Sequence, residues 1–517
     1  MSGPPPGRRS VASHWRHVLL REVGTPKITP PADCQVALVY PNTYAVGMSS
    51  LGYQMVYRWI NEHPGALAER FFCEGRPALS VENQRPLGQF DCVAFSIAYE
   101  LDYLNVVRFL LENHIPVRAA ERDPKAEPLV VAGGICTLVN RLPIYDLADI
   151  FVIGDGEETV ARLLAEWAES GGDRIRFIQS VAAIEGVEVT EGAFRRFGLD
   201  NSAHSAICNP QSAIGNPHFV PSLDSPDALS TVVTPNTELG ARCLVEIARG
   251  CPYRCRFCFT GNCLPYRARR FAVVREMLEK GRQLTSRFGL IAPAVGSHPD
   301  IDQICEWCLR QGLDVSFSSL RLEDVRPAMI ALLAAGGQQS VTIAPEAGSE
   351  RLRRQLGKNL ADERVVAFAA DVVSRGLTDL RMYFMVGLPG EQEEDIEAIG
   401  RLVEATHHAA VDSKPRPQTH VSIAVNVSVF VPKPGTPFAT QETPPGSRIK
   451  NRLRRLNGVF GKMSGVAFRM PSVAEAEVQR LLAWGDRDLL NALIESGRRD
   501  ASWRAFLALT TKDRKEH

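Results

Sequence analysis

Short apolar runs alternate with longer segments of helical periodicity over the first third of the chain. Helices are expected after Gly47, over 101–113 and from about residue 157. The apolar runs between them are QVALVY (35–40), FDCVAFSI (90–97), PLVVAGG (128–134) and DIFVIGDG (149–156). Near-continuously apolar strands that alternate with helices are typical of a parallel sheet covered on both faces. Residues 34–184 are therefore predicted to form a doubly wound α/β domain of flavodoxin-like topology, for which five strands would be suitable.

A second strand–helix series is predicted over residues 241–444. Its apolar runs are CLVEIARG (243–250), FGLIAPAVG (288–296), DVSFSSLR (314–321), SVTIAPEAGS (340–349), LRMYFMVGLPGE (380–391) and VSVFVPKPGTP (427–437). Six strands with intervening helices predict a partial (β/α)6 barrel of the TIM type. In such a barrel, reactive groups lie at the carboxyl ends of the strands.

Three further segments complete the predicted organisation. Residues 1–33 are rich in Pro, Arg and Gly and are expected to form a lead-in that is mobile or lies on a domain surface. Residues 185–240 show no sustained period and are expected to connect the two α/β domains. Residues 445–517 are charged and helical in pattern, which indicates a small helical cap at the C-terminus.

The composition limits the class of protein but does not indicate which reaction, if any, it catalyses. A chain of 517 residues is too long for one ordinary core. Its 59 basic and 59 acidic residues cancel, so no overall charge favours nucleic acid, and the short basic runs are interpreted as solvated helix faces. No apolar run reaches the roughly 18 residues of a membrane span. We expect a cytoplasmic protein, in which the twelve cysteines serve as thiols or metal ligands.

The segment ARGCPYRCRFC places three cysteines in a C-x3-C-x2-C loop directly after the first strand of the second series. These are Cys251, Cys255 and Cys258. Such spacing lets three thiolates converge on one iron–sulfur cluster and leaves a fourth iron without a protein ligand. Zinc is the competing metal, but zinc sites normally use four ligands in paired short spacings, and Cys263 completes no such pair.

With this loop, residues 240–440 resemble the radical S-adenosylmethionine (SAM) superfamily. The resemblance implies a [4Fe–4S] cluster on the three cysteines, SAM on the open iron, and reductive cleavage of SAM to a 5′-deoxyadenosyl radical. It also implies an external one-electron donor such as flavodoxin or ferredoxin. Phe257 stands where the family has an aromatic residue beside the adenine of SAM.

Further SAM contacts are implied at the ends of later strands. The VGLPGE turn supplies Gly387, Pro389 and Gly390, where glycines allow close backbone approach to a ligand. Polar groups near the ribose and carboxylate of SAM are expected from Ser319, Arg321 and Glu346. Glu346 is the strongest single candidate, and its alternative is an ion pair with Arg321 or Arg351. The Gly-Gly-Glu often found after the second strand is absent, because APAVGSHPD occupies its place.

The N-terminal domain resembles the cobalamin (B12)-binding domain that precedes the barrel in one large radical SAM subgroup. That domain usually carries D-x-H-x-x-G, a Ser or Thr, and Gly-Gly at successive strand ends. The corresponding positions here are Asn42, Tyr44, Gly47, Ser96, Gly133 and Gly134. Since Tyr44 replaces the histidine and a phenol is a poor metal ligand, either cobalamin binds without a protein ligand or the domain reads another molecule.

The leading hypothesis is a cobalamin-dependent radical SAM enzyme that transfers a methyl group or catalyses a ring-forming or rearrangement step. Its substrate is an unidentified small molecule or peptide. A methylthiotransferase is a second hypothesis, but it needs three more cluster cysteines, and Cys34, Cys73, Cys92 and Cys136 form no obvious set. A cluster-bearing scaffold without turnover is the third, although a scaffold has no need of an open iron.

Overall fold

The computed structural model describes residues 11–26, 28, 32–199, 216–499 and 502–513. The chain divides into two compact units. Unit 1 consists of residues 1–220, 230–242 and 481–517, and unit 2 consists of residues 221–229 and 243–480. The predicted connecting segment and the predicted C-terminal cap are therefore each divided between the two units. Residues 1–10 of the lead-in and 200–215 of the connecting segment lie outside the described residues.

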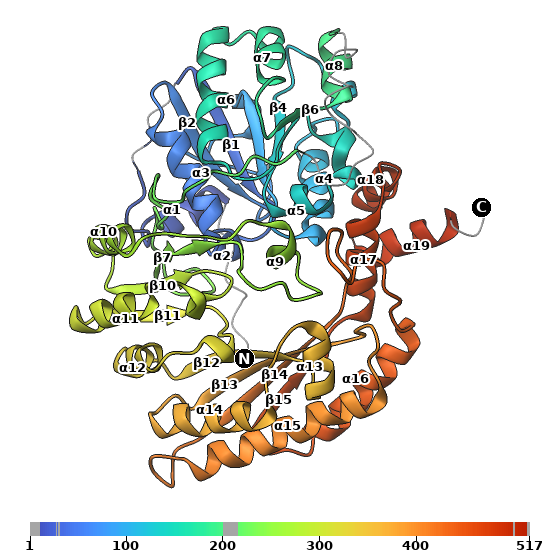
Figure 1. The fold of residues 1–517 in the computed structure, drawn as a ribbon. Coiled ribbons are helices and arrows are strands. Elements are labelled where there is room, and N and C mark those ends of the chain that lie inside the picture. Colours follow the sequence, from blue (N-terminus) through green and yellow to red (C-terminus); the bar gives the residue numbers. More distant parts are fainter. Residues whose placement is uncertain (1–10, 27, 29–31, 200–215, 500–501, 514–517) are drawn as a thin grey trace, which may run out of the picture. The chain divides into compact units, whose positions relative to one another are not determined.

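Unit 1 is built on a six-stranded sheet in the order β2-β1-β3-β4-β5-β6 (Figure 1). Its strands are β1 (Cys34–Tyr40), β2 (Ala66–Phe72), β3 (Cys92–Ser96), β4 (Leu129–Gly133), β5 (Ile150–Val152) and β6 (Val187–Val189). The first five run parallel, and β6 pairs antiparallel with β5. The order 2-1-3-4-5 is the flavodoxin-like one, which confirms the predicted doubly wound class.

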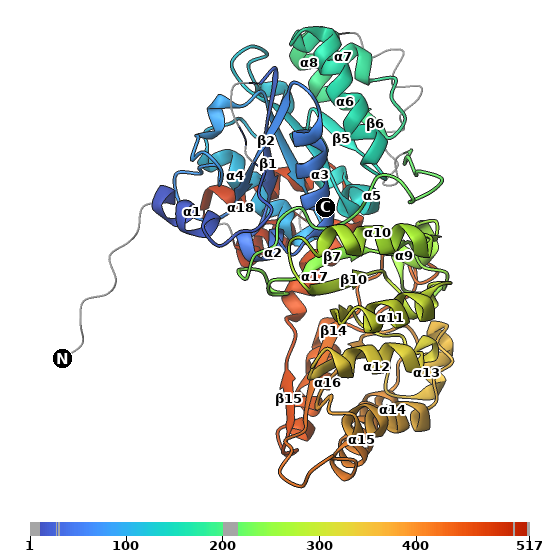
Figure 2. The same cartoon turned by 90° about the vertical axis from the view of Figure 1, so that its left-hand side faces the viewer.

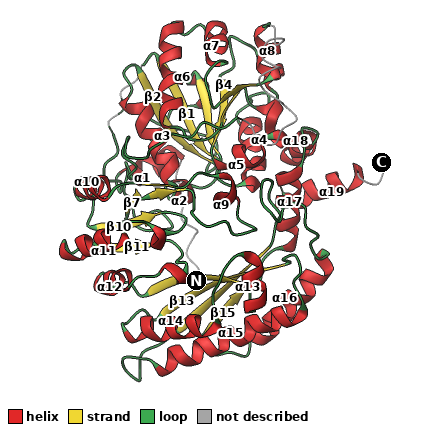
Figure 3. Cartoon of the chain, viewed as in Figure 1, coloured by secondary structure: helices red, strands yellow, loops and turns green. Residues whose placement is uncertain are grey.

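Helices lie on both sides of this sheet (Figure 3). The helices of unit 1 are α1 (Val11–Leu19), α2 (Tyr44–Gly47), α3 (Leu51–Glu62), α4 (Tyr103–Glu112), α5 (Ile135–Asn140), α6 (Glu157–Ser170), α7 (Arg174–Val181), α8 (Glu191–Phe197), α18 (Leu489–Arg499) and α19 (Trp503–Asp513), with short 3-10 turns η1 (Leu87–Gln89), η2 (Glu100–Asp102), η3 (Ala119–Glu121) and η4 (Leu142–Leu147). The lead-in contributes to the core, because Trp15 of α1 is 1% exposed and packs in the main apolar cluster of the unit.

Strand β2 was not among the predicted strands, because it carries charges in its buried interior. Arg70 is fully buried and donates to Glu22 at 2.8 Å and to Glu82 at 2.5 Å. Glu69, also fully buried, accepts from Arg85 at 2.9 Å. Each buried charge on the strand thus has an opposite charge beside it, as burial requires.

Unit 2 contains two main parallel sheets, β11-β10-β7 and β12-β13-β14-β15, and a β8-β9 pair. A parallel bridge between Leu320 and Ile343 joins the two main sheets. The strands are β7 (Cys243–Glu246), β8 (Ala248–Arg249), β9 (Arg267–Ala268), β10 (Arg287–Ile291), β11 (Asp314–Phe317), β12 (Ser340–Glu346), β13 (Asp379–Val386), β14 (Ser422–Val429) and β15 (Val466–Arg469). Each of the six predicted apolar runs overlaps one of these strands, and β15 extends the parallel series.

The helices of unit 2 follow its strands in chain order, and Figure 2 shows α10, α11, α12 and α14 one after another along the same side. They are α9 (Phe259–Cys263), α10 (Phe271–Gly281), α11 (Ile301–Arg310), α12 (Pro327–Ala335), α13 (Glu350–Leu356), α14 (Asp362–Ser374), α15 (Glu393–Asp412) and α16 (Gly446–Phe460), with turns η5 (Val295–Ser297) and η6 (Leu322–Asp324). Helix α17 (Val473–Trp484) begins in unit 2 and ends in unit 1. None of the described helices in either unit is long and apolar enough to cross a membrane.

Candidate active site

The cysteine loop of unit 2 runs from the end of β8 to the start of α9, and close backbone contacts hold its course. Gly250 has φ of +73°, and a Cβ there would lie 2.2 Å from the carbonyl oxygen of Pro265. A Cβ at Gly261 would lie 2.1 Å from the carbonyl oxygen of Tyr253. Only glycine fits at either position, so the loop path is built into the sequence around the three cysteines.

Hydrogen bonds close the loop around the cysteines. The Asn262 side chain donates to the carbonyl oxygens of Cys255 at 2.9 Å and Cys258 at 2.7 Å. The backbone of the loop is also tied to α13, since the N–H of Arg256 donates to the carbonyl oxygen of Leu356 at 3.0 Å. The loop is thereby fixed against two neighbouring helices, α9 and α13.

The three thiols are close enough to affect one another's pKa, and backbone N–H groups donate to the sulfurs of Cys251 and Cys258. Burial raises the pKa of Cys251 and of Cys258, and the neighbouring cysteines raise it further. Backbone N–H groups oppose this rise: that of Tyr253 at Cys251, and those of Gly261 and Thr260 at Cys258. N–H groups directed at sulfur are the surroundings that stabilise a thiolate ligand.

Arg321 lies in the segment after β11 and contacts the thiol of Cys255, the second cysteine of the motif. Its Nη1 donates to the Sγ of Cys255 at 3.3 Å, and its guanidinium lies 3.9 Å from the ring centroid of Tyr253. Glu323 accepts from the same guanidinium at 2.8 Å, and the Tyr253 hydroxyl donates to Asp324. A residue predicted to contact SAM is thus placed on a cysteine sulfur.

No group of three or more His, Cys, Asp or Glu side chains among the described residues is placed as a single metal ion would require. A [4Fe–4S] cluster instead takes each thiolate on a separate iron. The fit of the cluster therefore rests on the cysteine spacing and on the donors around the sulfurs.

Phe257, between the second and third cysteines, is half-buried and packs against a small apolar cluster. The members of that cluster are Ala347, Leu352, Leu356, Met385, Leu388, Phe430 and Phe438. They come from the ends of β12, β13 and β14 and from α13. Phe257 therefore lies where several strand ends of unit 2 meet.

The VGLPGE turn after β13 adopts a left-handed backbone conformation at its two glycines. Gly387 and Gly390 have φ of +85° and +71°, in the left-handed region. The N–H of Gly387 donates to Glu391 at 2.8 Å, and the side chain of Gln355 donates to the carbonyl oxygen of Pro389 at 3.1 Å. The turn is buried except at Gly390, which is exposed.

Glu346 ends β12 with φ of +71°, which is uncommon for a residue with a side chain. Its carboxylate accepts from the Nζ of Lys358 at 2.8 Å, so the alternative considered for it, an ion pair with Arg321 or Arg351, is not the one that forms. Arg351 instead pairs with Asp395 of α15. Glu346 remains close to the loop, since its charge contributes to raising the pKa of Cys258. Ser319 is half-buried in the segment that also carries Arg321.

In unit 1, Ser96, Gly133 and Gly134 meet at the carboxyl edge of the sheet. Ser96 pairs with Gly133 in the β3–β4 register. Gly134 has φ of +108°, and a Cβ there would lie 2.5 Å from the carbonyl oxygen of Ile97. Both Gly134 and the adjacent Ile135 are exposed, so this edge offers backbone and an apolar side chain to a ligand.

The segment that follows β1 is more buried than the sequence suggested. Tyr44 is 3% exposed within the apolar core, and its hydroxyl donates to Glu22. A Cβ at Gly47 would lie 2.5 Å from the ring of Phe72, so this glycine is required for packing. Asn42 is half-buried, and its amide donates to Asp102 at 2.8 Å. Tyr44 is therefore a core residue rather than a member of the open edge.

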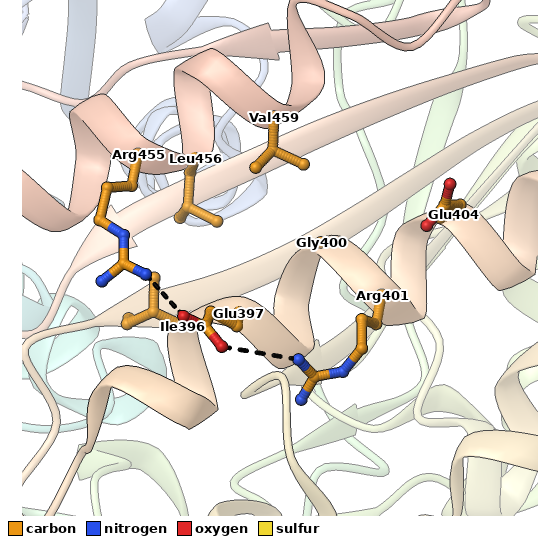
Figure 4. Close-up of a pocket in the computed structure, with 8 residues that line it drawn as sticks. All are labelled: Ile396, Glu397, Gly400, Arg401, Glu404, Arg455, Leu456 and Val459. Carbon is orange, nitrogen blue, oxygen red and sulfur yellow. Dashed lines mark hydrogen bonds and ion pairs between the residues drawn. The ribbon is translucent and has the colours of Figure 1, made fainter.

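Figure 4 shows a separate small pocket between α15 and α16. Its apolar part is formed by Ile396, Leu456 and Val459, and Glu397 bridges Arg455 at 2.6 Å and Arg401 at 3.8 Å across its rim. The pocket contains none of the predicted site residues. It is a groove between two packed helices, and we assign no chemistry to it.

Two α/β units, one with a three-cysteine loop at a strand end, define an iron–sulfur type of enzyme fold. The family model described as "Radical SAM superfamily" matches residues 245–403, and that described as "Radical SAM proteins, N-terminal" matches residues 52–189. The chain belongs to the radical SAM superfamily. Membership implies a [4Fe–4S] cluster and SAM as cofactors.

Comparison with individual proteins gave one curated relative and several solved structures of similar fold. The chain is 28% identical over 462 residues to an uncharacterized protein of Methanocaldococcus jannaschii, with 88% of this chain and 89% of the relative covered. The structure of the radical SAM methyltransferase TsrM from Kitasatospora setae, with cobalamin and a [4Fe–4S] cluster bound, matches with a TM-score of 0.57 at 14% identity, covering 90% of this chain and 99% of TsrM. The cobalamin-dependent radical SAM enzyme OxsB with aqua-cobalamin bound matches with a TM-score of 0.50 at 14% identity, covering 82% of this chain and 62% of OxsB. At these identities the likeness concerns the fold.

Three side chains at the site were not among the site residues predicted from the sequence. Tyr253 lies inside the cysteine motif and under Arg321, Lys358 pairs with Glu346, and Arg452 donates to Glu391 behind the VGLPGE turn. Only Tyr253 could have been found from the sequence, by its place between the first two cysteines.

Proposed function

We propose that this radical SAM enzyme binds its [4Fe–4S] cluster through Cys251, Cys255 and Cys258 and also uses cobalamin. When bound, the cluster supplies the electron that cleaves SAM to a 5′-deoxyadenosyl radical. The proposed reaction is methyl transfer, or a ring-forming or rearrangement step, on a small molecule or peptide. An external donor such as flavodoxin or ferredoxin would supply the electron. We propose the reducing cytoplasm as the location, because it keeps cysteines available as thiols and cluster ligands.

The observation that carries the proposal is the set of donors around the cysteine loop. Arg321 donates to Cys255 at 3.3 Å, and backbone N–H groups serve the other two sulfurs. Within the loop, Phe257 offers an aromatic face, and the Gly387–Gly390 turn offers exposed backbone at Gly390. We assign these, with Ser319 and Glu346, to SAM, where Lys358 would hold the Glu346 carboxylate in position.

Cobalamin is proposed for the carboxyl edge of the unit 1 sheet. Ser96, Gly133 and Gly134 leave that edge with little side-chain bulk, which suits close approach of a large ligand. TsrM and OxsB, which share this fold, are described with cobalamin bound. Because the Tyr44 hydroxyl is directed at Glu22, we propose binding without a tyrosine ligand to cobalt.

The methylthiotransferase alternative is less well supported. It requires three cluster cysteines that meet in unit 1, but Cys34 and Cys92 begin β1 and β3, at the amino edge of the parallel sheet, whereas Cys73 follows β2 and Cys136 lies in α5 after β4, at the carboxyl edge. No three of these four cysteines therefore lie at the same edge of the sheet. We therefore keep the cobalamin-dependent reaction as the first candidate.

The test begins with anaerobic purification of the full chain with cobalamin supplied, followed by iron, sulfide and cobalt quantification and an optical spectrum. About four irons and one cobalt per chain are expected. Four irons without cobalt would refute the cobalamin assignment and leave the radical chemistry standing.

The Cys255→Ala variant tests the cluster ligands. It should lose most of the iron and all 5′-deoxyadenosine formation, because two thiolates cannot hold the cluster. Cys308→Ala is the matched control, since Cys308 is buried in α11 and forms no part of the loop. Retained 5′-deoxyadenosine formation in Cys255→Ala would overturn the assignment.

A further inference from the structure

One face of the β12–β15 sheet is open, which is unusual for a parallel sheet. Along β13, Leu380, Met382 and Phe384 are buried, whereas Arg381 and Tyr383 between them are exposed, Tyr383 by 38%. The buried side faces helices α14, α15 and α16, which lie along the sheet in Figure 1. The alternation shows that the opposite side carries no covering layer of protein within unit 2.

The open face has few bulky side chains, and they are polar. In the strand register, Tyr383 lies beside Asn426, and Asn426 lies beside Arg469. The exposed or half-buried residues around them are small: Thr342, Ala344, Ala424, Ser428 and Ala467. The result is a shallow floor from which Arg381, Tyr383 and Arg469 project.

The floor carries two positive charges, Arg381 on β13 and Arg469 on the edge strand β15. Neither Arg381 nor Arg469 forms an ion pair within the described part of the chain. The acids of the sheet stand at its ends: Asp379 accepts from Ser422 at 2.7 Å, and Glu346 pairs with Lys358 at 2.8 Å. The two arginines are two strands and two residues apart, roughly 10 Å by 7 Å, which their long side chains can span.

The open face leads to the cysteine loop. Met385 follows Arg381 and Tyr383 at the same two-residue spacing and so lies on the same face of β13. It belongs to the apolar cluster against which Phe257 packs. Arg381 is therefore about 13 Å along one strand from a member of the cluster against which the loop residue Phe257 packs.

We propose that Arg381 and Arg469, with Tyr383 and Asn426, form the substrate-binding surface and select a substrate that carries a carboxylate or phosphate group. A guanidinium binds either oxyanion through two parallel hydrogen bonds, and two unpaired guanidiniums on one floor favour an anion over a neutral or cationic ligand. Tyr383 and Asn426 would hydrogen-bond the neighbouring part of the substrate. The inference rests on the proposed function only for the reaction that follows binding.

The test is calorimetric titration of the full chain, with and without reconstituted cluster, using phenyl phosphate and benzoate as separate probes. Wild type should bind at least one probe, and the one bound more tightly distinguishes phosphate from carboxylate. Arg381→Gln and Arg469→Gln should each weaken binding at least about tenfold, the effect of losing one charged hydrogen bond or more. Both variants should keep the wild-type circular dichroism spectrum, because both arginines are exposed.

Arg364→Gln is the matched control, because Arg364 is exposed on α14, on the covered side of the sheet. It should leave both probe affinity and 5′-deoxyadenosine formation unchanged. Absence of binding by wild type at millimolar probe, or equal weakening by Arg364→Gln, overturns the inference. Probe binding without any SAM cleavage would refute the proposed function alone, and SAM cleavage without probe binding would refute this inference alone.

Discussion

Arg321 holds the cysteine loop through contacts of three kinds. It donates to the Cys255 sulfur at 3.3 Å, stacks on Tyr253 at 3.9 Å and pairs with Glu323 at 2.8 Å. Burial lowers the pKa of Arg321, but Glu323 and Cys255 outweigh this and raise it overall, so its positive charge is retained. A fixed cation and hydrogen bond at a ligating sulfur favour the reduced, more negative state of a cluster.

We predict that Arg321→Gln shifts the reduction potential of the reconstituted cluster to a more negative value. The loss of one positive charge beside Cys255 destabilises the reduced state, and a redox titration followed by electron paramagnetic resonance measures the shift. Arg326→Gln removes the same charge from an exposed position five residues on and should leave the potential unchanged. An unchanged potential in Arg321→Gln would show that the contact is only structural.

At the scale of elements, the connection from β13 to α15 is held by one buried carboxylate. Glu391 accepts from the N–H of Gly387 at 2.8 Å and from Arg452 of α16 at 2.6 Å. Gln392 then caps α15 in a reciprocal capping box with Asp395. Burial raises the pKa of Glu391 to about 7, against the lowering effects of Gly387 and Arg452.

This raised pKa predicts a pH-dependent stability. The folded state prefers the protonated carboxyl, so the contribution is complete below the ordinary pKa of 4.5 and is lost as the pH rises to about 7. Relative to Glu391→Gln, wild type should lose roughly 1–3 kcal/mol of unfolding free energy over this range, since one pKa unit corresponds to about 1.4 kcal/mol.

Urea unfolding at pH 4.5, 6 and 7.5 measures this difference. The exposed change Glu404→Gln on α15 should follow the wild-type pH dependence. If wild type instead gains stability over Glu391→Gln with rising pH, the ion pair with Arg452 dominates and the predicted sign is wrong.

At the scale of the whole molecule, the chain returns to unit 1 after it has completed unit 2. Asn140 of α5 donates to the carbonyl oxygens of Leu482 at 3.0 Å and Gly485 at 2.8 Å. Gly497 of α18 lies against α4, where a Cβ would come within 3.1 Å of Leu111. Unit 1 therefore depends on residues from both ends of the chain.

Two matched leucine truncations test this division. Leu490 of α18 and Leu453 of α16 are both buried, at 0% and 1% exposure. Each change to alanine should cost about 2–5 kcal/mol. Hydrogen exchange should rise in α4 of unit 1 for Leu490→Ala, and around β13 and α15 of unit 2 for Leu453→Ala. The same exchange pattern in both variants would contradict the division.

The sequence by itself determined the parts of this protein whose cause is local. Apolar runs that alternate with helical segments predicted most of the parallel strands, and in unit 1 these runs are near-continuous because a strand buried on both faces must be apolar along its length. The spacing of Cys251, Cys255 and Cys258 predicted the cluster loop, because three ligands within eight residues can meet without help from the rest of the chain. Both α/β units and the radical SAM family followed from these two signals.

Only the tertiary structure decided the features whose cause lies far away in the chain. Strand β2 is stable because Glu22 and Glu82 neutralise Arg70, and Tyr44 turns inward because Glu22 accepts a hydrogen bond from its hydroxyl. Arg321 meets Cys255 across 66 residues, and Lys358 rather than an arginine meets Glu346. Partners of buried charges are chosen by how the elements pack, and no local pattern of residues records that choice.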